Sequence, residues 1–374
     1  MTRLYGHLYA PADLGLCAVT LEGDRIAAID RRASAPAGSL GGPDCVIIPG
    51  LIDIQLNGGF GQDFSDPASE LDLVCRELPR FGVSAFLPTV ITSAPSVYAS
   101  CLRNLRRREE PGRARALGVH LEGPYLSPSY AGTHDRAWIR DPDIAEARSW
   151  LAAGDVRMVT LAPERPGALE LIRALVANGV VVSMGHSDAD WEEADAAVRS
   201  GASLGTHLFN AMRPLHHREP GLPGYLLANH LPVSVVSDGV HLAPEMLRLV
   251  ARVKCPDEFV LVTDALAGLG MPAGPFELAG RLIVSDGTVG RLSDGTLSGS
   301  VLPLPHALAN LLHLGVEPAA AVQAATFNPA RVLACGDWLG QVRVGGVADV
   351  VVLDGQWEVE ATFIGGEPAY RRDS

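Results

Sequence analysis

Eight runs of consecutive apolar residues, separated by amphipathic segments, restrict the fold of this 374-residue chain more than any other feature. The runs begin at Val46, Gly82, Ala116, Val156, Val180, Leu204, Pro232 and Phe259. Apolar side chains on successive residues are typical of parallel strands that are covered on both faces. Strand–helix alternation implies right-handed crossovers, and eight repeats in about 220 residues favour a closed barrel. We therefore predict an α/β fold, a (β/α)8 TIM barrel.

The two ends of the chain have a different pattern. Residues 1 to about 45 and the tail from Gly340 contain strand-like segments and tight glycine turns with no helical segment between them. We predict that both termini form one small β-sandwich module beside the barrel. The predicted boundaries assign residues 1–47 and 335–374 to the module and residues 48–334 to the barrel.

Composition excludes several classes of partner. The formal net charge of −13 argues against nucleic acid, although a local cluster of Arg and His can still bind an anionic substrate. No apolar run is long enough to cross a bilayer, and the N-terminus lacks a basic region followed by an apolar stretch. We expect a cytoplasmic protein without a membrane partner. The six cysteines form no CxxC pair, so we expect free thiols rather than disulfides or a thiolate zinc site.

Polar side chains gather where the apolar runs end, and in a barrel these ends form the active site. Glu122, His186 and His207 lie toward the ends of three different runs and offer one carboxylate and two imidazoles. This is the ligand set of a catalytic zinc that keeps an open position for water. The alternative is that each is a polar cap on a buried strand, satisfied by local hydrogen bonds.

Asp264 follows the eighth run, where a proton shuttle is needed. A carboxylate there can accept a proton from water and pass it to a leaving amine. The alternative is that Asp264 caps the N-terminus of a helix, which the following GLG segment and Pro272 make less favourable.

Nine motifs occur in a fixed order along the chain: PGLIDIQLNGG from Pro49, GVHLEGPYLSP from Gly118, AGTHD from Ala131, GHSDA from Gly185, THLFNAM from Thr206, REPG from Arg218, SDGVH from Ser237, VTDA from Val262 and TLSGS from Thr296. In this order they resemble the N-acetylglucosamine-6-phosphate deacetylases, a family of the amidohydrolase superfamily. HLEGP and HLFNAM are the most specific of them. The resemblance covers nearly the whole chain, including the ADVVVLDG tail.

The resemblance implies roles for individual residues. Glu122, His186 and His207 become metal ligands, and Asp264 becomes the catalytic acid and base. His134 is implied to hydrogen-bond the acetyl carbonyl and stabilise the oxyanion. The substrate-binding set comprises the backbone N–H groups at Asn210 and Ala211, the charges of Arg218 and His241 near the phosphate, and Thr133, Leu297, Ser298 and Gly299 along the sugar. One phosphate ligand is often lent by a neighbouring subunit in this family, which implies a homodimer.

One departure from the wider superfamily affects the metal count. Many amidohydrolases have HxH at the end of the first strand, but Gln55 and Asn57 occupy the matching positions here. Amides are poor zinc ligands, and the only lysine, Lys254, lies on the approach to the eighth strand. We therefore expect one divalent metal ion per subunit, with zinc first and Fe²⁺, Co²⁺ or Mn²⁺ left open. Gln55 is expected to hydrogen-bond the substrate or a water held by the metal.

The resemblance implies hydrolysis of the acetamide of N-acetyl-D-glucosamine 6-phosphate to D-glucosamine 6-phosphate and acetate, in amino-sugar catabolism and cell-wall sugar recycling. One alternative keeps the barrel but changes the substrate to N-acetylgalactosamine 6-phosphate or to another N-acyl compound. A second alternative is a non-catalytic scaffold. Scaffolds of this kind usually lose ligands, whereas the three predicted ligands and Asp264 are all present here.

Overall fold

The computed structural model describes residues 1–32 and 34–373; residues 33 and 374 fall in the predicted module ranges and lie outside the described residues. Eight parallel strands form the barrel sheet, one within each predicted apolar run: β5 (Leu51–Leu56), β8 (Val83–Ile91), β10 (Val119–Glu122), β11 (Val156–Leu161), β12 (Val181–Met184), β13 (Leu204–Gly205), β14 (Val233–Val236) and β15 (Phe259–Val262). A ninth strand, β9 (Arg115–Ala116), pairs with β8. The prediction of a parallel eight-stranded barrel is confirmed.

The first and last barrel strands, β5 and β15, meet and nearly close the ring. The backbone N–H of Asp264 donates to the carbonyl of Gln55 at 3.0 Å. Below this contact, the buried carboxylate of Asp53 accepts hydrogen bonds from the Thr263 hydroxyl at 2.5 Å and from the Thr263 backbone at 3.3 Å. The closure therefore holds the residues that follow β15 against the end of β5.

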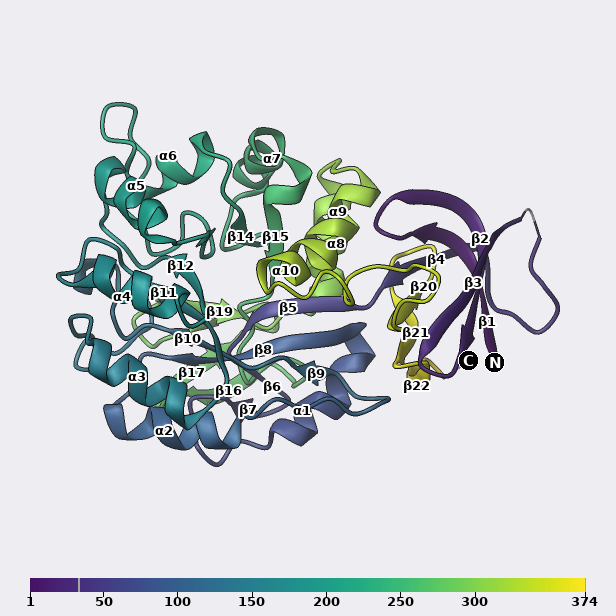
Figure 1. The fold of residues 1–374 in the computed structure, drawn as a ribbon, viewed down its shortest axis with the longest axis horizontal. Coiled ribbons are helices and arrows are strands. Elements are labelled where there is room, and N and C mark those ends of the chain that lie inside the picture. The colour runs from purple at the N-terminus through teal and green to yellow at the C-terminus, as the bar shows by residue number, and fades with distance from the viewer. Residues whose placement is uncertain (33, 374) are drawn as a thin grey trace.

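Helices follow each barrel strand and cover its outer face (Figure 1): α1 (Leu71–Glu77), α2 (Pro95–Asn104), α3 (Ile144–Ala153), α4 (Ala168–Val176), α5 (Trp191–Ser200), α6 (Gly221–Ala228), α7 (Pro244–Val253) and α8 (Leu304–His313). Two further helices, α9 (Pro318–Ala325) and α10 (Phe327–Val332), complete this layer, and the described residues also form the 3₁₀ turns η1 (Leu78–Phe81), η2 (Pro128–Tyr130) and η3 (Pro256–Glu258). Helix α5 shows how the local sequence determines where a helix begins and ends. Asp190 and Glu193 form a capping box at its start, and Gly201 ends it at φ 112°.

Two antiparallel insertions interrupt the barrel. A hairpin of β6 (Gly58–Gly59) and β7 (Gln62–Asp63) follows β5, and a four-stranded sheet follows β15: β16 (Gly274–Leu278), β17 (Arg281–Ser285), β18 (Val289–Arg291) and β19 (Leu297–Ser300). The N–H of Ser300 donates to the Asp264 carbonyl at 3.0 Å. A Cβ at Gly299 would lie 2.7 Å from that oxygen, so only glycine allows this approach.

The chain termini meet in one seven-stranded mixed sheet beside the barrel (Figure 1). Its strands are β1 (Thr2–Tyr9), β2 (Asp13–Glu22), β3 (Arg25–Arg31), β4 (Leu40–Pro49), β20 (Val350–Leu353), β21 (Val359–Ile364) and β22 (Glu367–Arg371). Strands β1 and β4 are parallel, and the other pairs are antiparallel. Arg115 and Asp349 form a buried ion pair between the barrel and this sheet. The exact boundaries of two domains stay a prediction.

All six cysteines lie within the described residues and are free thiols, as predicted. Within residues 1–32 and 34–373, no helix is both long enough and apolar enough to cross a membrane.

Candidate active site

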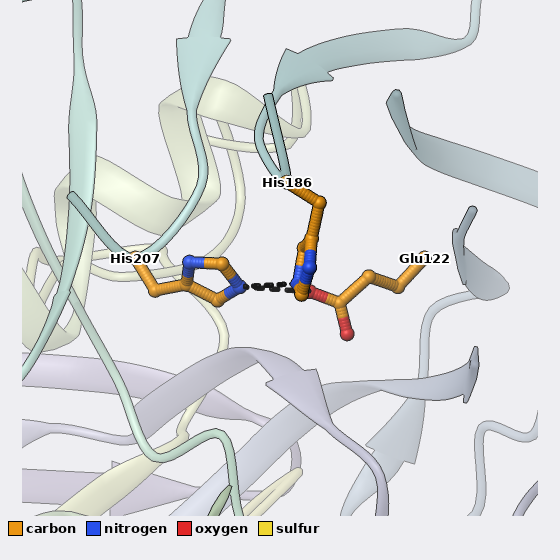
Figure 2. A group of neighbouring side chains, drawn as sticks. All are labelled: Glu122, His186 and His207. Carbon is orange, nitrogen blue, oxygen red and sulfur yellow. Dashed lines mark hydrogen bonds and ion pairs between the residues drawn. The ribbon is translucent and has the colours of Figure 1, made fainter. Parts of the chain in front are cut away.

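Three side chains from separate strands converge at the carboxyl end of the barrel (Figure 2). Glu122 is the last residue of β10, and His186 and His207 lie two residues beyond β12 and β13. All three are buried, and their ligand atoms lie within 4.8 Å of one another. Nε2 of His207 is 2.9 Å from Oε1 of Glu122 and 3.1 Å from Nε2 of His186. The predicted convergence is therefore present.

The hydrogen bonds around this trio fit a cation. Nδ1 of His186 lies 2.9 Å from the Tyr130 carbonyl, which can only accept, so Nδ1 carries the proton and the lone pair of Nε2 faces the trio. Nε2 of His207 faces this lone pair at 3.1 Å, so either a proton or a metal ion must lie between the two nitrogens. Burial opposes the ionisation of Glu122, yet its close contacts with His134, His186 and His207 hold the pKa of its carboxyl well below the usual value. A buried carboxylate with two imidazoles is a metal-capable site.

Backbone strain is concentrated around this rim. Five non-glycine residues here have positive φ: His186 at 49°, His207 at 31°, Phe209 at 74°, Ala211 at 48° and Asp264 at 50°. Each such conformation costs about 1–3 kcal/mol and persists only where the surroundings enforce it. The strained turns aim side chains at the barrel mouth immediately after three of its strands.

Asp264 is buried beside the trio, and two amides contact it. Its Oδ1 accepts hydrogen bonds from Asn57 at 2.7 Å and from Gln55 at 3.3 Å. The Gln55 amide also donates to Oε1 of Glu122 at 2.8 Å. Burial, with the nearby charge of Glu122, raises the pKa of Asp264 to about 6. The helix-cap alternative for Asp264 is wrong, because the chain continues into β16 and the next described helix begins at Leu304.

His134 is held as a neutral hydrogen-bond donor. The backbone N–H of Thr92 points at Nδ1 of His134 from 3.2 Å, and the Thr92 hydroxyl oxygen lies 2.8 Å from the same atom. Because a backbone N–H can only donate, Nδ1 accepts and the ring proton resides on Nε2. Burial, assisted by His186, lowers the pKa of His134 to about 4. Nε2 lies 3.7 Å from Oε2 of Glu122, so the N–H points toward the trio.

A cavity of about 330 Å³ opens above these residues. Its wall includes the trio together with Asn57, Ile91, Ser129, Tyr130, Gly132, Thr133, His134, Asn210, Ala211, His241, Asp264, Thr296, Leu297 and Ser298. The hydroxyl of Thr133 donates to Ser298 at 3.2 Å, which joins two of the predicted sugar-lining segments. The cavity can therefore hold a small polar substrate against the trio.

Comparison with known proteins agrees with this geometry. A profile of the amidohydrolase family matches residues 46–371. The chain belongs to the amidohydrolase family. It is 40% identical to N-acetylglucosamine-6-phosphate deacetylase of Bos taurus over 90% of this chain and 86% of that protein. It is 37% identical to N-acetylgalactosamine-6-phosphate deacetylase of Escherichia coli O157:H7 over 87% of this chain and 88% of that protein.

Solved structures that resemble this chain include deacetylases of the same kind. N-acetyl-D-glucosamine-6-phosphate deacetylase of Mycobacterium smegmatis superposes with a TM-score of 0.91 at 32% identity, over 99% of this chain and 100% of that chain. A mutant of that enzyme in complex with N-acetyl-D-glucosamine-6-phosphate gives a TM-score of 0.89 at 31% identity, over 99% of this chain and 100% of that chain.

Of the predicted phosphate-binding residues of this amidohydrolase, some line the cavity and one lies on an exposed loop outside it. His241 lines the cavity, and its Nδ1 lies 2.5 Å from Asp238, which leaves Nε2 for a ligand. The Asn210 N–H already donates to the His207 carbonyl at 2.9 Å, while the Ala211 N–H has no acceptor among the described residues. Arg218 lies on an exposed loop and is not among the described residues that line the cavity of its own chain.

Sequence reasoning missed Thr92 and Tyr130, which fix the ring protons of His134 and His186. Thr92 directly follows β8, so the rule of polar residues at strand ends would have found it, whereas Tyr130 acts through its backbone. The apolar run that contains Glu122 also holds two polar residues that lie outside the cluster. His120 lies deeper and bonds Thr160 at 2.8 Å, and Tyr125 points outward to Glu146.

Proposed function

We propose that this amidohydrolase hydrolyses the acetamide of N-acetyl-D-glucosamine 6-phosphate, in the service of amino-sugar catabolism. One observation carries the proposal: a metal-capable trio, a buried carboxylate of raised pKa and a neutral imidazole N–H face one cavity. These are the parts that amide hydrolysis needs, namely an activated water, an acid–base group and a donor for the oxyanion. The activity of the related deacetylases supports the choice of substrate.

The metal-binding group is Glu122, His186 and His207, for which we propose one zinc ion. When bound there, the ion would polarise the amide carbonyl and lower the pKa of water. Gln55 and Asn57 occupy the two positions where many amidohydrolases have the HxH histidines. Both amides already donate hydrogen bonds to carboxylates, so we propose that no second metal ion binds there. Fe²⁺, Co²⁺ and Mn²⁺ suit the same donor set.

Two residues handle the protons and the developing charge. The Asp264 carboxylate accepts the proton of the attacking water and delivers it to the departing nitrogen. His134 donates its Nε2 proton in a hydrogen bond to the carbonyl oxygen as negative charge forms there. Asn57 and Gln55 hold Asp264 in place through Oδ1, which leaves Oδ2 for the proton.

We propose that the phosphate is bound by His241, the N–H groups at Asn210–Ala211 and Arg218, and the sugar by Thr133, Gln55 and the Leu297–Gly299 segment. His241 and Ala211 line the cavity. Arg218 extends from an exposed loop, so we propose that it reaches the cavity of a second copy in a homodimer. A cytoplasmic location also stays a prediction.

The proposed function is tested by acetate release from the gluco- and galacto-configured N-acetylhexosamine 6-phosphates, with metal content measured on the same sample. We expect faster turnover of the gluco epimer and one metal ion per chain. Faster turnover of the galacto epimer would favour N-acetylgalactosamine 6-phosphate as the substrate. No acetate from either compound, with metal bound, would overturn the proposal.

Removal of the proposed phosphate ligand should affect binding more than turnover. We expect Arg218→Ala to raise KM for the phosphorylated sugar about 10- to 100-fold, because a charged hydrogen bond contributes about 1.5–3 kcal/mol. The kcat should change little. Arg199→Ala serves as the control, since Arg199 is exposed on α5 and pairs with Asp195. An unchanged KM in Arg218→Ala would favour an unphosphorylated substrate.

The proposed oxyanion donor should affect turnover. We expect His134→Gln to lower kcat about 10²- to 10³-fold with little change in KM, because the bond strengthens only as charge develops. Thr92→Val is a matched control, since it keeps the backbone N–H that sets the tautomer. Its kcat should fall less than about tenfold. An equal loss in both variants would contradict the role of His134.

The pH profile should show an acid limb. Asp264 must be ionised to accept a proton, so activity is lost as pH falls through its pKa. Burial and Glu122 raise that pKa to about 6, and a cation at the trio lowers it again. We expect kcat/KM to fall tenfold per pH unit below a midpoint between about pH 4 and pH 6. A midpoint above pH 7 would contradict the assignment.

A further inference from the structure

A second group of metal-ligating side chains lies in the connections that lead into β14 and β15. It consists of His230, Cys255 and Glu258, whose ligand atoms all lie within 4.8 Å of one another. His230 follows α6, and Cys255 and Glu258 span the η3 turn that follows α7. Helix-to-strand connections of a (β/α)8 barrel lie at its amino end, opposite the catalytic cavity. The group is therefore separate from the proposed active site.

We propose that His230, Cys255 and Glu258 bind a zinc ion that cross-links the α6–β14 and α7–β15 connections. Each residue supplies a different donor, namely an imidazole nitrogen, a thiolate sulfur and a carboxylate oxygen, and water can take the fourth tetrahedral position. The sulfur donor favours zinc over magnesium or calcium, which prefer oxygen alone. Glu258 lies three residues after Cys255 in the same turn, but His230 is 25 residues away, so only the fold brings the imidazole to this thiol.

Glu258 is already oriented for this role. Its Oε2 accepts hydrogen bonds from Lys254 at 3.1 Å and from the Cys255 backbone at 3.3 Å, which directs Oε1 toward Nδ1 of His230 at 2.6 Å. These contacts fix the position of the carboxylate, as a ligand requires.

Lys254 also stabilises the positions of Glu258 and the segment before His230. Its buried ammonium donates to the carbonyls of Leu226 and Asn229 at 3.0 and 2.7 Å, at the carboxyl end of α6. The two carbonyls and Oε2 of Glu258 together satisfy its three N–H donors. The contact also holds the residue before His230 next to Glu258. The His230 side chain is 89% exposed and can turn onto an ion without repacking of the core.

The thiol gives this site its own spectroscopic signal. The proposed catalytic trio contains only nitrogen and oxygen donors, so a thiolate-to-Co²⁺ charge-transfer band can arise only from a cysteine site. We therefore expect Co²⁺, titrated into the full chain, to produce such a band in the near ultraviolet.

Three variants test whether the band arises at this cysteine. Cys255→Ser should abolish the band yet fold normally, because serine is a good N-cap at the start of η3. His230→Ala should weaken Co²⁺ binding at least about tenfold. Cys45→Ser is the matched control, since Cys45 is a half-buried thiol beside Glu360, and it should keep the band.

Zinc content gives an independent measurement. With zinc in excess, wild type should hold one equivalent more than Cys255→Ser, whatever occupies the catalytic trio, and both should release acetate at the same rate. The proposal is overturned if wild type shows no charge-transfer band, if the band survives in Cys255→Ser, or if zinc content is equal in the two proteins. None of these outcomes depends on the proposed catalytic activity.

Discussion

We expect Asp264→Asn to lower kcat for acetate release about 10³- to 10⁴-fold while the metal content stays unchanged. One carboxylate carries both proton transfers in the proposed reaction, and acid–base catalysis contributes about 10²- to 10⁴-fold. The substituted amide keeps an oxygen to accept the bonds from Asn57 and Gln55, so the local structure should persist. Steady-state kinetics and elemental analysis on one preparation provide the measurement.

Asp135→Asn is the control for this prediction. Asp135 directly follows His134 but uses its carboxylate in a local turn, where it accepts the N–H of Ala137 at 2.9 Å. An asparagine can accept the same bond, so activity should be retained. Near-wild-type kcat in Asp264→Asn, with its metal intact, would make the proposed mechanism wrong.

The second large effect concerns the metal. We expect Glu122→Gln to lose the bound ion and to lower kcat/KM about 10³-fold or more, because the Lewis acid contributes several kcal/mol. Glu122 is the only anionic member of the trio, and an amide is a poor ligand for zinc. Excess zinc should restore little activity. Elemental analysis after purification without chelator, together with acetate release, checks both parts.

Glu164→Gln provides the matched comparison. Glu164 is a half-buried carboxylate near the same rim, and it accepts hydrogen bonds from Ser187 and the Asp188 backbone rather than joining the trio. This variant should keep its metal and most of its activity. Full metal content in Glu122→Gln would show that the cation lies elsewhere.

The barrel could be predicted from sequence because its signal is local. Each of the eight strands lies in an apolar run, including β13, which has only two residues, Leu204 and Gly205. Parallel strands are covered on both faces, so most of their residues are apolar, and the pattern does not depend on which strand lies beside which. The joining of the termini in one sheet also followed from local patterns, since each flank lacked helical segments.

The depth of a side chain in the barrel could not be predicted in the same way. His120 and Glu122 both follow from the rule of polar residues near strand ends. They lie two residues apart on one strand, or about 6–7 Å. That step puts Glu122 at the trio and His120 in the interior, where burial lowers its pKa to about 4 and Thr160 bonds its ring. The sequence pattern does not show at which residue of a strand the open end of the barrel begins.

By itself the sequence determined the order of strands and helices and the chemical types available at the barrel mouth, because both depend on side chains and their near neighbours. The tertiary structure decided which groups meet. Asn57 bonds Asp264 across 207 positions, Thr92 sets the proton of His134, and His230 faces Glu258 beside Cys255. Such contacts depend on barrel closure and on hydrogen-bond direction, and neither is encoded in any single segment of the chain.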